Sequence, residues 1–447
     1  MRSARTWDSY RRRHVLATFG MRSPDVRLRD PGKSFPDRIW RPQRPQHQQE
    51  SAVPKACIFN YPFTALCLVA LFGFGNIAVF YGFYPYLLSI GIPPFWASWL
   101  LALEPLAAFV LRPFISPLLD SGSALAAMRA SLVMIAMALI GYAHAHSVPL
   151  LVCLRVFHGA AFVTLVSATT ALLVHFIPPG RSGQAFGLFS LTTMLPFALM
   201  PPLTEWLLRH VSNAGHAYAW ISLMTLPALA LLAPFAPYAA HARESEQSRR
   251  DRPGLKDITQ ALRNPEIALV LGASLLTFLG STLLFFFMKD FGMSLGLTNA
   301  GLFFTVSTGA TIAVRLAGSG FFDRLDKRRT LMLSFCVLVA CYASYALVDS
   351  PLPFLMAAAV FGACMGVILP LLQSTLFIVG EPSKRGLNAN LMLSTMDAGY
   401  FLGPYLGGML LGAGFSHAHL FGLSSLMALG ACLLIRQATA SSVQSHP

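Results

Sequence analysis

The feature that most constrains this chain is a series of twelve long apolar segments. A helix needs about 20 consecutive apolar residues to cross the hydrocarbon core of a bilayer. Hydrophobic residues make up 55% of the chain and charged residues only 12%, which is too little polar surface for a water-soluble globule. The candidate spans are residues 61–82, 94–119, 128–146, 149–176, 184–208, 217–238, 266–288, 297–321, 330–348, 352–379, 386–413 and 417–435.

These segments are predicted to be helices. Every backbone polar group in hydrocarbon must be paired within the protein, and the segments lack the ten-residue alternation of barrel strands. We therefore expect an all-α membrane protein with twelve transmembrane helices.

The second half of the chain repeats the first at a fixed offset of 203 residues. Three pairs at the ends of apolar runs set this offset: Arg112 and Arg315, Ser116 and Ser319, and Asp120 and Asp323. The same shift also pairs residues that shape helices, among them Gly159 with Gly362 and Pro201 with Pro404. A long period built of hydrophobic segments is typical of transporters made from parallel repeats.

The apolar pattern divides the chain into two bundles. We predict six-helix bundles at residues 58–238 and 266–437, joined by a charged cytoplasmic linker at 239–265 that lets them rock against each other. Residues 1–57 are rich in Arg, Pro and Gln and are predicted to be a disordered basic cytoplasmic tail. Residues 438–447 are expected to form a short cytoplasmic tail.

The positions of Lys and Arg predict the orientation in the membrane. The loops on one side of the membrane, together with the segment after the last span, carry fifteen Lys and Arg residues, and the loops on the other side carry two. Because Lys and Arg are enriched in cytoplasmic loops, the side with fifteen, which also holds both termini, is expected to be cytoplasmic. The net charge of +14 is then mainly a topology signal, and no element suited to nucleic-acid binding appears. Arg outnumbers Lys by 27 to 6, which is typical of proteins from GC-rich bacterial genomes. We therefore expect the membrane to be a bacterial inner membrane.

Several motifs resemble those of the major facilitator superfamily (MFS). The loop at 319–328 resembles the basic loop motif that follows helices 2 and 8 in this family, and the loop at 116–125 is a degenerate copy. Arg155 and Gly159 resemble the family's helix 4 signature, and helix 11 carries a Gly/Pro-rich run around Pro404. The resemblance implies two parallel six-helix repeats and a cytoplasmic gate, for which the candidates are Asp120, Asp323, Arg324 and Arg328.

Four ionisable residues inside the spans are candidates for proton coupling. Each such group costs about 2.5 to 3.5 kcal/mol to insert and needs a partner, water or a task. Glu104 and Asp397 lie near the middle of helices 2 and 11, which the resemblance places face to face, so protonation could remove their charge as a cavity closes. Arg155, with His158 on the same helix face, is expected to pair with Glu104. Structural ion pairs and a hydrogen-bonded core histidine are the alternatives.

Arg112 and Arg315 lie near the predicted cytoplasmic interface. They are about 12 Å along a straight helix from Asp120 and Asp323, too far for pairing. Snorkelling toward lipid headgroups explains them sufficiently and is favoured slightly over gating.

The resemblance also implies that helices 1, 4, 7 and 10 line a central cavity. Aromatic and hydroxyl side chains there would suit a small, partly apolar organic solute, although such residues also serve helix packing. The candidates are Asn76, Tyr81, Tyr84, Thr164, Ser167, Thr277, Ser281 and Gln373.

These features predict a secondary active transporter of a small organic solute, coupled to protons, with efflux slightly favoured. Proton symport for uptake of an organic acid or sugar is the close alternative. A non-transporting receptor on this scaffold and a membrane-embedded enzyme are the rival classes. We find no HExxH, GxSxG or Walker A sequence, and the seven cysteines lack metal-ligand spacing, so no enzymatic activity, cofactor or metal is expected. The expected partners are solute, protons and lipid, with a monomeric chain.

Overall fold

The computed structural model of the chain describes residues 59–119, 121–177, 182–240, 255–318, 326–381 and 385–444. They belong to one compact unit, Ala56–Pro447. All regular elements within these residues are helices, as predicted. The predicted tail at 1–57 lies outside the described residues.

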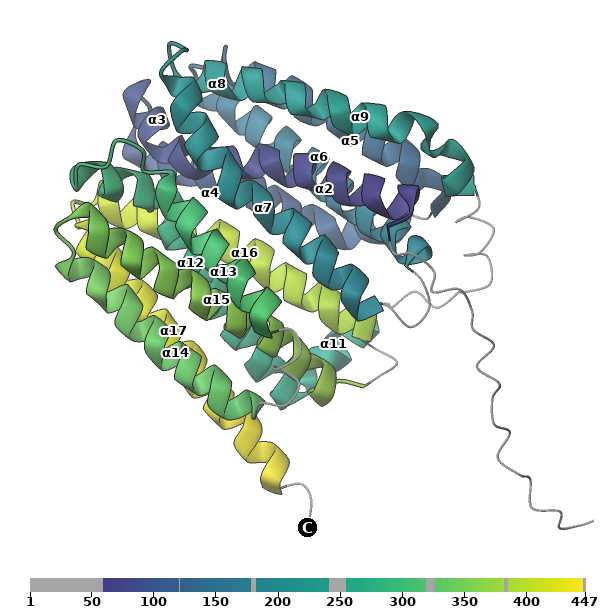
Figure 1. The fold of residues 1–447 in the computed structure, drawn as a ribbon, viewed down its shortest axis with the longest axis vertical. Coiled ribbons are helices and arrows are strands. Elements are labelled where there is room, and N and C mark those ends of the chain that lie inside the picture. Colours follow the sequence, from purple (N-terminus) through teal and green to yellow (C-terminus); the bar gives the residue numbers. More distant parts are fainter. Residues whose placement is uncertain are drawn as a thin grey trace, which may run out of the picture. The chain divides into compact units, whose positions relative to one another are not determined.

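The N-terminal half, residues 61–240, contains six helical segments (Figure 1). The first is a long helix interrupted by one 3₁₀ turn, and the last contains two such turns. The elements are α2 (Tyr61–Ala78), η1 (Val79–Gly82), α3 (Phe83–Ser89), α4 (Pro94–Leu118), α5 (Ser121–Gly141), α6 (Val148–Leu173), η2 (Val174–Phe176), α7 (Ser182–Leu208), α8 (Ala214–Ile221), η3 (Ser222–Met224), α9 (Thr225–Leu232) and η4 (Ala233–Phe235).

The C-terminal half, residues 265–444, contains six more. A short helix, α11 (Leu255–Arg263), lies within the predicted linker, and the last helix continues past the predicted boundary at 437. The elements are α12 (Pro265–Ser294), α13 (Leu302–Gly318), α14 (Lys327–Ser344), η5 (Tyr345–Leu347), α15 (Pro351–Val379), α16 (Arg385–Gly412) and α17 (His417–Gln444).

The helices have the length and composition of membrane spans. Ten in the described residues are long and apolar enough to cross a bilayer, and α13 is a shorter apolar helix. The remaining segment, α16, has 28 residues and carries Asp397 in its middle. The described helices are thus consistent with the predicted twelve spans.

The sequence repeat recurs in the helix packing. In the N-terminal half, Gly159 of α6 lies so close to the carbonyl oxygen of Glu104 in α4 that a Cβ atom there would collide with it. In the C-terminal half, Gly362 of α15 lies against the carbonyl oxygen of Ser307 in α13 in the same way. Both residues of this second crossing follow those of the first by 203 positions. The two halves therefore share a helix crossing that requires glycine.

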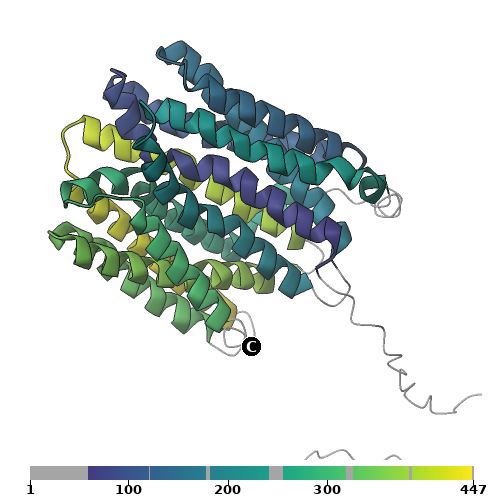
Figure 2. The ribbon, with the colours of Figure 1, turned by 45° about the horizontal axis from the view of Figure 1, so that its top comes forward.

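The halves meet along three lines of contact. Helix α4 packs against α16, α7 against α13, and the η1–α3 segment against α12, and the turned view in Figure 2 shows the same helices. Contacts are close at the end that carries the loops near residues 90–93 and 413–416, which we call the predicted external end. The ring centroids of Trp99 and Tyr405 are 4.7 Å apart there.

Candidate functional site

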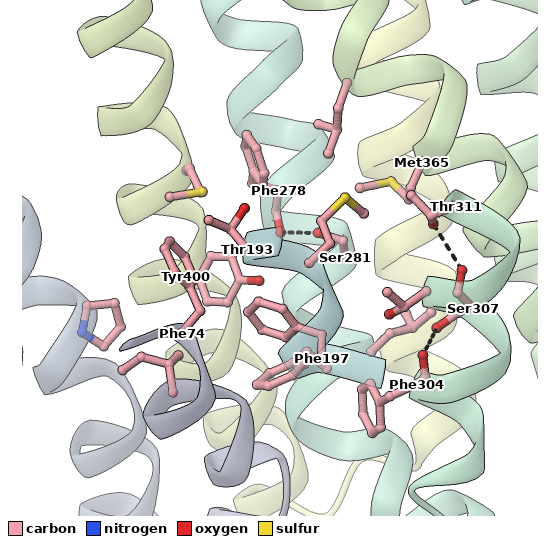
Figure 3. A pocket seen from close by; sticks show the side chains of 18 of the residues that line it. Phe74, Thr193, Phe197, Phe278, Ser281, Phe304, Ser307, Thr311, Met365 and Tyr400 are labelled. Carbon is pink, nitrogen blue, oxygen red and sulfur yellow. Dashed lines mark hydrogen bonds between the residues drawn. The ribbon is translucent and has the colours of Figure 1, made fainter. Parts of the chain in front are cut away.

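A cavity of about 300 Å³ lies between the two halves. Its walls come from α2, α4, α6 and α7 on one side and α12, α13, α15 and α16 on the other. This volume is at the lower end of the range for small-molecule sites. The arrangement therefore suits a small solute held between the repeats (Figure 3).

Aromatic and thioether side chains form nearly half of the cavity wall. The residues concerned are Phe74, Phe162, Phe197, Phe278, Phe285, Phe303, Phe304, Phe361, Tyr400, Met194, Met365 and Met396. Four hydroxyls in the wall donate to carbonyls of their own helices, Thr193 at 3.0 Å, Ser281 at 2.9 Å, Ser307 at 3.3 Å and Thr311 at 2.9 Å (Figure 3). Because their protons are used, these oxygens face the cavity mainly as acceptors.

Glu104 lines the cavity and pairs with Arg155. The Arg155 Nη2 atom is 3.6 Å from the Glu104 carboxylate, and both side chains are buried. The guanidinium also donates to the carbonyls of Leu100 and Leu101, at 2.8 and 3.1 Å. It lies over the ring of Phe80, 4.9 Å from the centroid. The pairing expected from the sequence is present, and backbone bonds hold Arg155 independently of it.

His158 is fully buried one turn away and does not line the cavity. Its Nε2 atom lies 2.7 Å from the amide oxygen of Asn76. The Asn76 amide nitrogen donates in turn to the Gly73 carbonyl, so Nε2 acts as the donor. The geometry of His158 matches a hydrogen-bonded core histidine.

Asp397 lines the cavity and forms an ion pair across the two halves. Arg112 of α4 donates through Nε at 2.5 Å and through Nη2 at 3.0 Å to the two carboxylate oxygens. Both side chains are less than a tenth exposed. The expectation that Arg112 snorkels to lipid is therefore wrong, because α16 supplies a carboxylate that local spacing does not reveal.

Arg315 of α13 also lines the cavity instead of reaching toward lipid headgroups. Its Nη1 atom donates to the Ser190 hydroxyl at 2.7 Å, across the contact between α13 and α7. The snorkelling prediction is thus wrong for this arginine as well.

Of the predicted gate residues, the structure describes only Arg328. Its Nη2 atom donates to the Arg436 carbonyl at 3.3 Å, which links the start of α14 to α17. Asp120, Asp323 and Arg324 lie outside the described residues.

Among the residues predicted to line a cavity, Ser281 lines this one and the other seven do not. Thr164 and Thr277 donate to the carbonyls of their own helices, and Gln373 is exposed. Tyr84 donates to the Gly408 carbonyl at 3.4 Å. Asn76 is buried against His158, and Tyr81 is buried against Glu205. The Ser167 hydroxyl is buried with no hydrogen-bond partner among the described residues.

A second polar cluster joins the halves nearer the predicted external end. Lys289 of α12 is 2.9 Å from the Glu205 carboxylate of α7. The Tyr81 hydroxyl donates to the same carboxylate, and the Lys289 ammonium lies 5.4 Å from the centre of the Tyr81 ring. The sequence reasoning missed Glu205, although an acidic residue inside an apolar segment is itself a signal.

Two repeated helical bundles around a solute-sized cavity, with ion pairs between them, are typical of secondary transporters. The family model of the Major Facilitator Superfamily matches residues 66–386. The chain belongs to this superfamily.

Solved structures support the same fold. The nucleoside transporter NupG matches with a TM-score of 0.65 and 13% identity, over 85% of this chain and 98% of NupG. A bacterial homologue of the human lysosomal transporter Spinster, in an inward-facing and unoccupied conformation, matches with a TM-score of 0.59 and 15% identity. That match covers 85% of this chain and 95% of the homologue. No curated protein sequence matches the chain.

Proposed function

We propose that this MFS member moves a small organic solute across a bacterial inner membrane by alternating access, coupled to protons, in the direction of efflux. The observation that carries the proposal is the pair of carboxylates, Glu104 and Asp397, in the wall of one cavity shared by both repeats. A solute and a proton can then compete for, or cooperate at, the same site.

Protonation of Asp397 supplies the coupling step. Its carboxylate holds Arg112 across the contact between α4 and α16. Adding a proton removes the negative charge and weakens the bidentate bond. The two helices are then freer to separate, which links proton binding to movement of the halves.

Glu104 is the second proposed proton site. Its partner Arg155 keeps two backbone hydrogen bonds, so it stays in place when the carboxylate becomes neutral. A proton can therefore arrive and leave without rearrangement of α6.

The contacts between the halves support a closed external gate. Trp99, Tyr405 and the Lys289–Glu205 pair join the halves near the predicted external end. With both termini cytoplasmic, as the Lys and Arg count favours, the cavity would load from inside. Tight packing of the Gly/Pro-rich helix α16, where a Cβ atom on Gly403 would collide with Thr282, also suits a helix that moves as a rigid body.

Reconstitution into liposomes tests the proposal. A panel of labelled solutes is followed with and without a pH gradient, in both directions. We expect one solute class to move only in the direction opposite to protons, and Asp397→Asn to abolish the gradient dependence. If the solute moves in the same direction as protons, the transporter is an uptake symporter and the proposed direction of efflux is wrong. Absence of flux for every solute, together with specific binding, would indicate a receptor and contradict the proposal.

A further inference from the structure

One charge in the cavity wall has no neutralising partner among the described residues. Arg315 lines the cavity, and none of the ion pairs between described residues includes it. Its one hydrogen bond to a described residue reaches the neutral hydroxyl of Ser190. The Nε atom of the same guanidinium is buried, and no atom of the described part of the chain accepts a hydrogen bond from it.

The sequence repeat explains how this charge arises. A shift of 203 residues makes Arg315 equivalent to Arg112, and Met194 equivalent to Asp397. Arg112 meets the carboxylate of Asp397 across the halves. At the equivalent position of α7 the chain has Met194, whose thioether carries no charge. Met194 and Asp397 both line the cavity, so the duplicated arginine is retained without its acidic partner.

The charges around the cavity then leave one positive charge in excess. Glu104 is balanced by Arg155 and Asp397 by Arg112. Arg315 remains, always charged and with donors still free. A guanidinium in a low-dielectric cavity attracts an anion strongly, because water competes for it only weakly.

We propose that Arg315 binds the anionic group of the transported solute, and that the solute is a small organic monoanion with an aromatic or apolar body. A carboxylate or sulfonate matches the planar donors of the guanidinium. One unbalanced cation favours a single negative charge over the double charge of a phosphate ester. The phenyl rings of Phe197, Phe285 and Phe304 supply the surface for the apolar body. This inference rests on the proposed function, since it names the solute class for the same cavity.

Binding to the purified full-length chain in detergent tests the inference. The probes are matched trios on benzene, naphthalene and indole rings: the carboxylate, its carboxamide and the corresponding aryl phosphate. Titration calorimetry gives each Kd. We expect at least one ring to bind as the carboxylate about tenfold or more tightly than as the carboxamide, the gain typical of a charge-assisted hydrogen bond.

Variants assign this preference to Arg315. Arg315→Met should make carboxylate and carboxamide bind equally, and Arg315→Lys should keep part of the preference. Met194→Asp supplies the missing carboxylate and should also remove the preference. Arg329→Met, which changes an exposed arginine at the start of α14, is the matched control and should leave it intact. Melting temperatures confirm that each variant is folded.

Three results would overturn the inference. In the first, no ring binds more tightly as the carboxylate than as the carboxamide. In the second, the phosphates bind more tightly than the carboxylates. In the third, the carboxylate preference survives Arg315→Met. Liposome flux separates this failure from failure of the proposed function. Gradient-driven flux of neutral or cationic solutes alone would refute the anion and leave transport standing. Carboxylate binding without any flux would support the anion site and refute the proposed transport.

Discussion

At the scale of single residues, the buried ion pair between Arg112 and Asp397 is the most consequential contact. It joins helices from the two halves, and both side chains are less than a tenth exposed. Removing one partner from such a pair leaves an uncompensated charge, whereas removing both often costs little. Stability and coupling should therefore respond differently to single and double substitutions.

We predict that Asp397→Asn lowers the free energy of unfolding by about 3 to 5 kcal/mol, because Arg112 stays buried without a counter-charge. The double variant Arg112→Met, Asp397→Leu should regain most of this stability but not proton-coupled flux. Thermal melting in detergent and liposome flux measure the two effects. A double variant as unstable as the single one would show that the loss of stability does not come from the uncompensated charge of Arg112.

Glu104→Gln is expected to uncouple transport from protons while the chain stays folded. The amide keeps the size of the side chain, and Arg155 keeps its bonds to the carbonyls of Leu100 and Leu101. Flux driven by a pH gradient should fall at least tenfold, while solute exchange at equal pH persists. Glu266→Gln, at the start of α12 and outside the cavity wall, is the control. Undiminished gradient-driven flux in Glu104→Gln would exclude this carboxylate from coupling.

At the scale of helices, the two repeats share a crossing that depends on a backbone contact. Gly159 and Gly362 each lie against a carbonyl oxygen of a neighbouring helix, and a methyl group at either position would force the helices apart. Since α4 and α13 also line the cavity, this packing sets the shape of the site.

Gly362→Ala should lower the melting temperature by several degrees, because α13 and α15 must separate to admit the new methyl group. Gly309→Ala is the matched control on α13, where a Cβ atom has open space. That variant should leave the melting temperature unchanged or raise it slightly, as alanine favours helix over glycine. Equal effects of the two substitutions would contradict the role of the crossing.

At the scale of the whole helical unit, the sequence predicted the helices and the repeat better than the contacts between halves. Apolar segments and the 203-residue offset are properties of local sequence and periodicity. Asp397 is 285 positions from Arg112, so spacing along one helix could not reveal the pair. The same limit hid the contact between Lys289 and Glu205. Of the eight residues predicted to line the cavity, only Ser281 does so, and aromatic residues form much of the wall instead.

The Lys289–Glu205 pair should hold the halves together near the predicted external end. We predict that Glu205→Gln increases labelling of Ser98→Cys by a membrane-impermeant maleimide several-fold, in a background without the native cysteines. Ser98 is fully buried and lies against Gly408 of the other half, so it reacts only when that end opens. Arg209→Gln, an exposed change nearby, is the control. Equal labelling in all variants would mean that the pair does not restrain this end.

The most direct test of the account measures distances across both ends of the helical unit in lipid nanodiscs. Spin labels at His146 and Leu347 span the predicted external end, and labels at Val174 and Arg329 span the predicted cytoplasmic end; all four positions are exposed. The account predicts opposite changes when pH or solute is varied, with one distance lengthening as the other shortens. Distances that stay fixed, or that change in the same sense at both ends, would contradict alternating access between the two repeats.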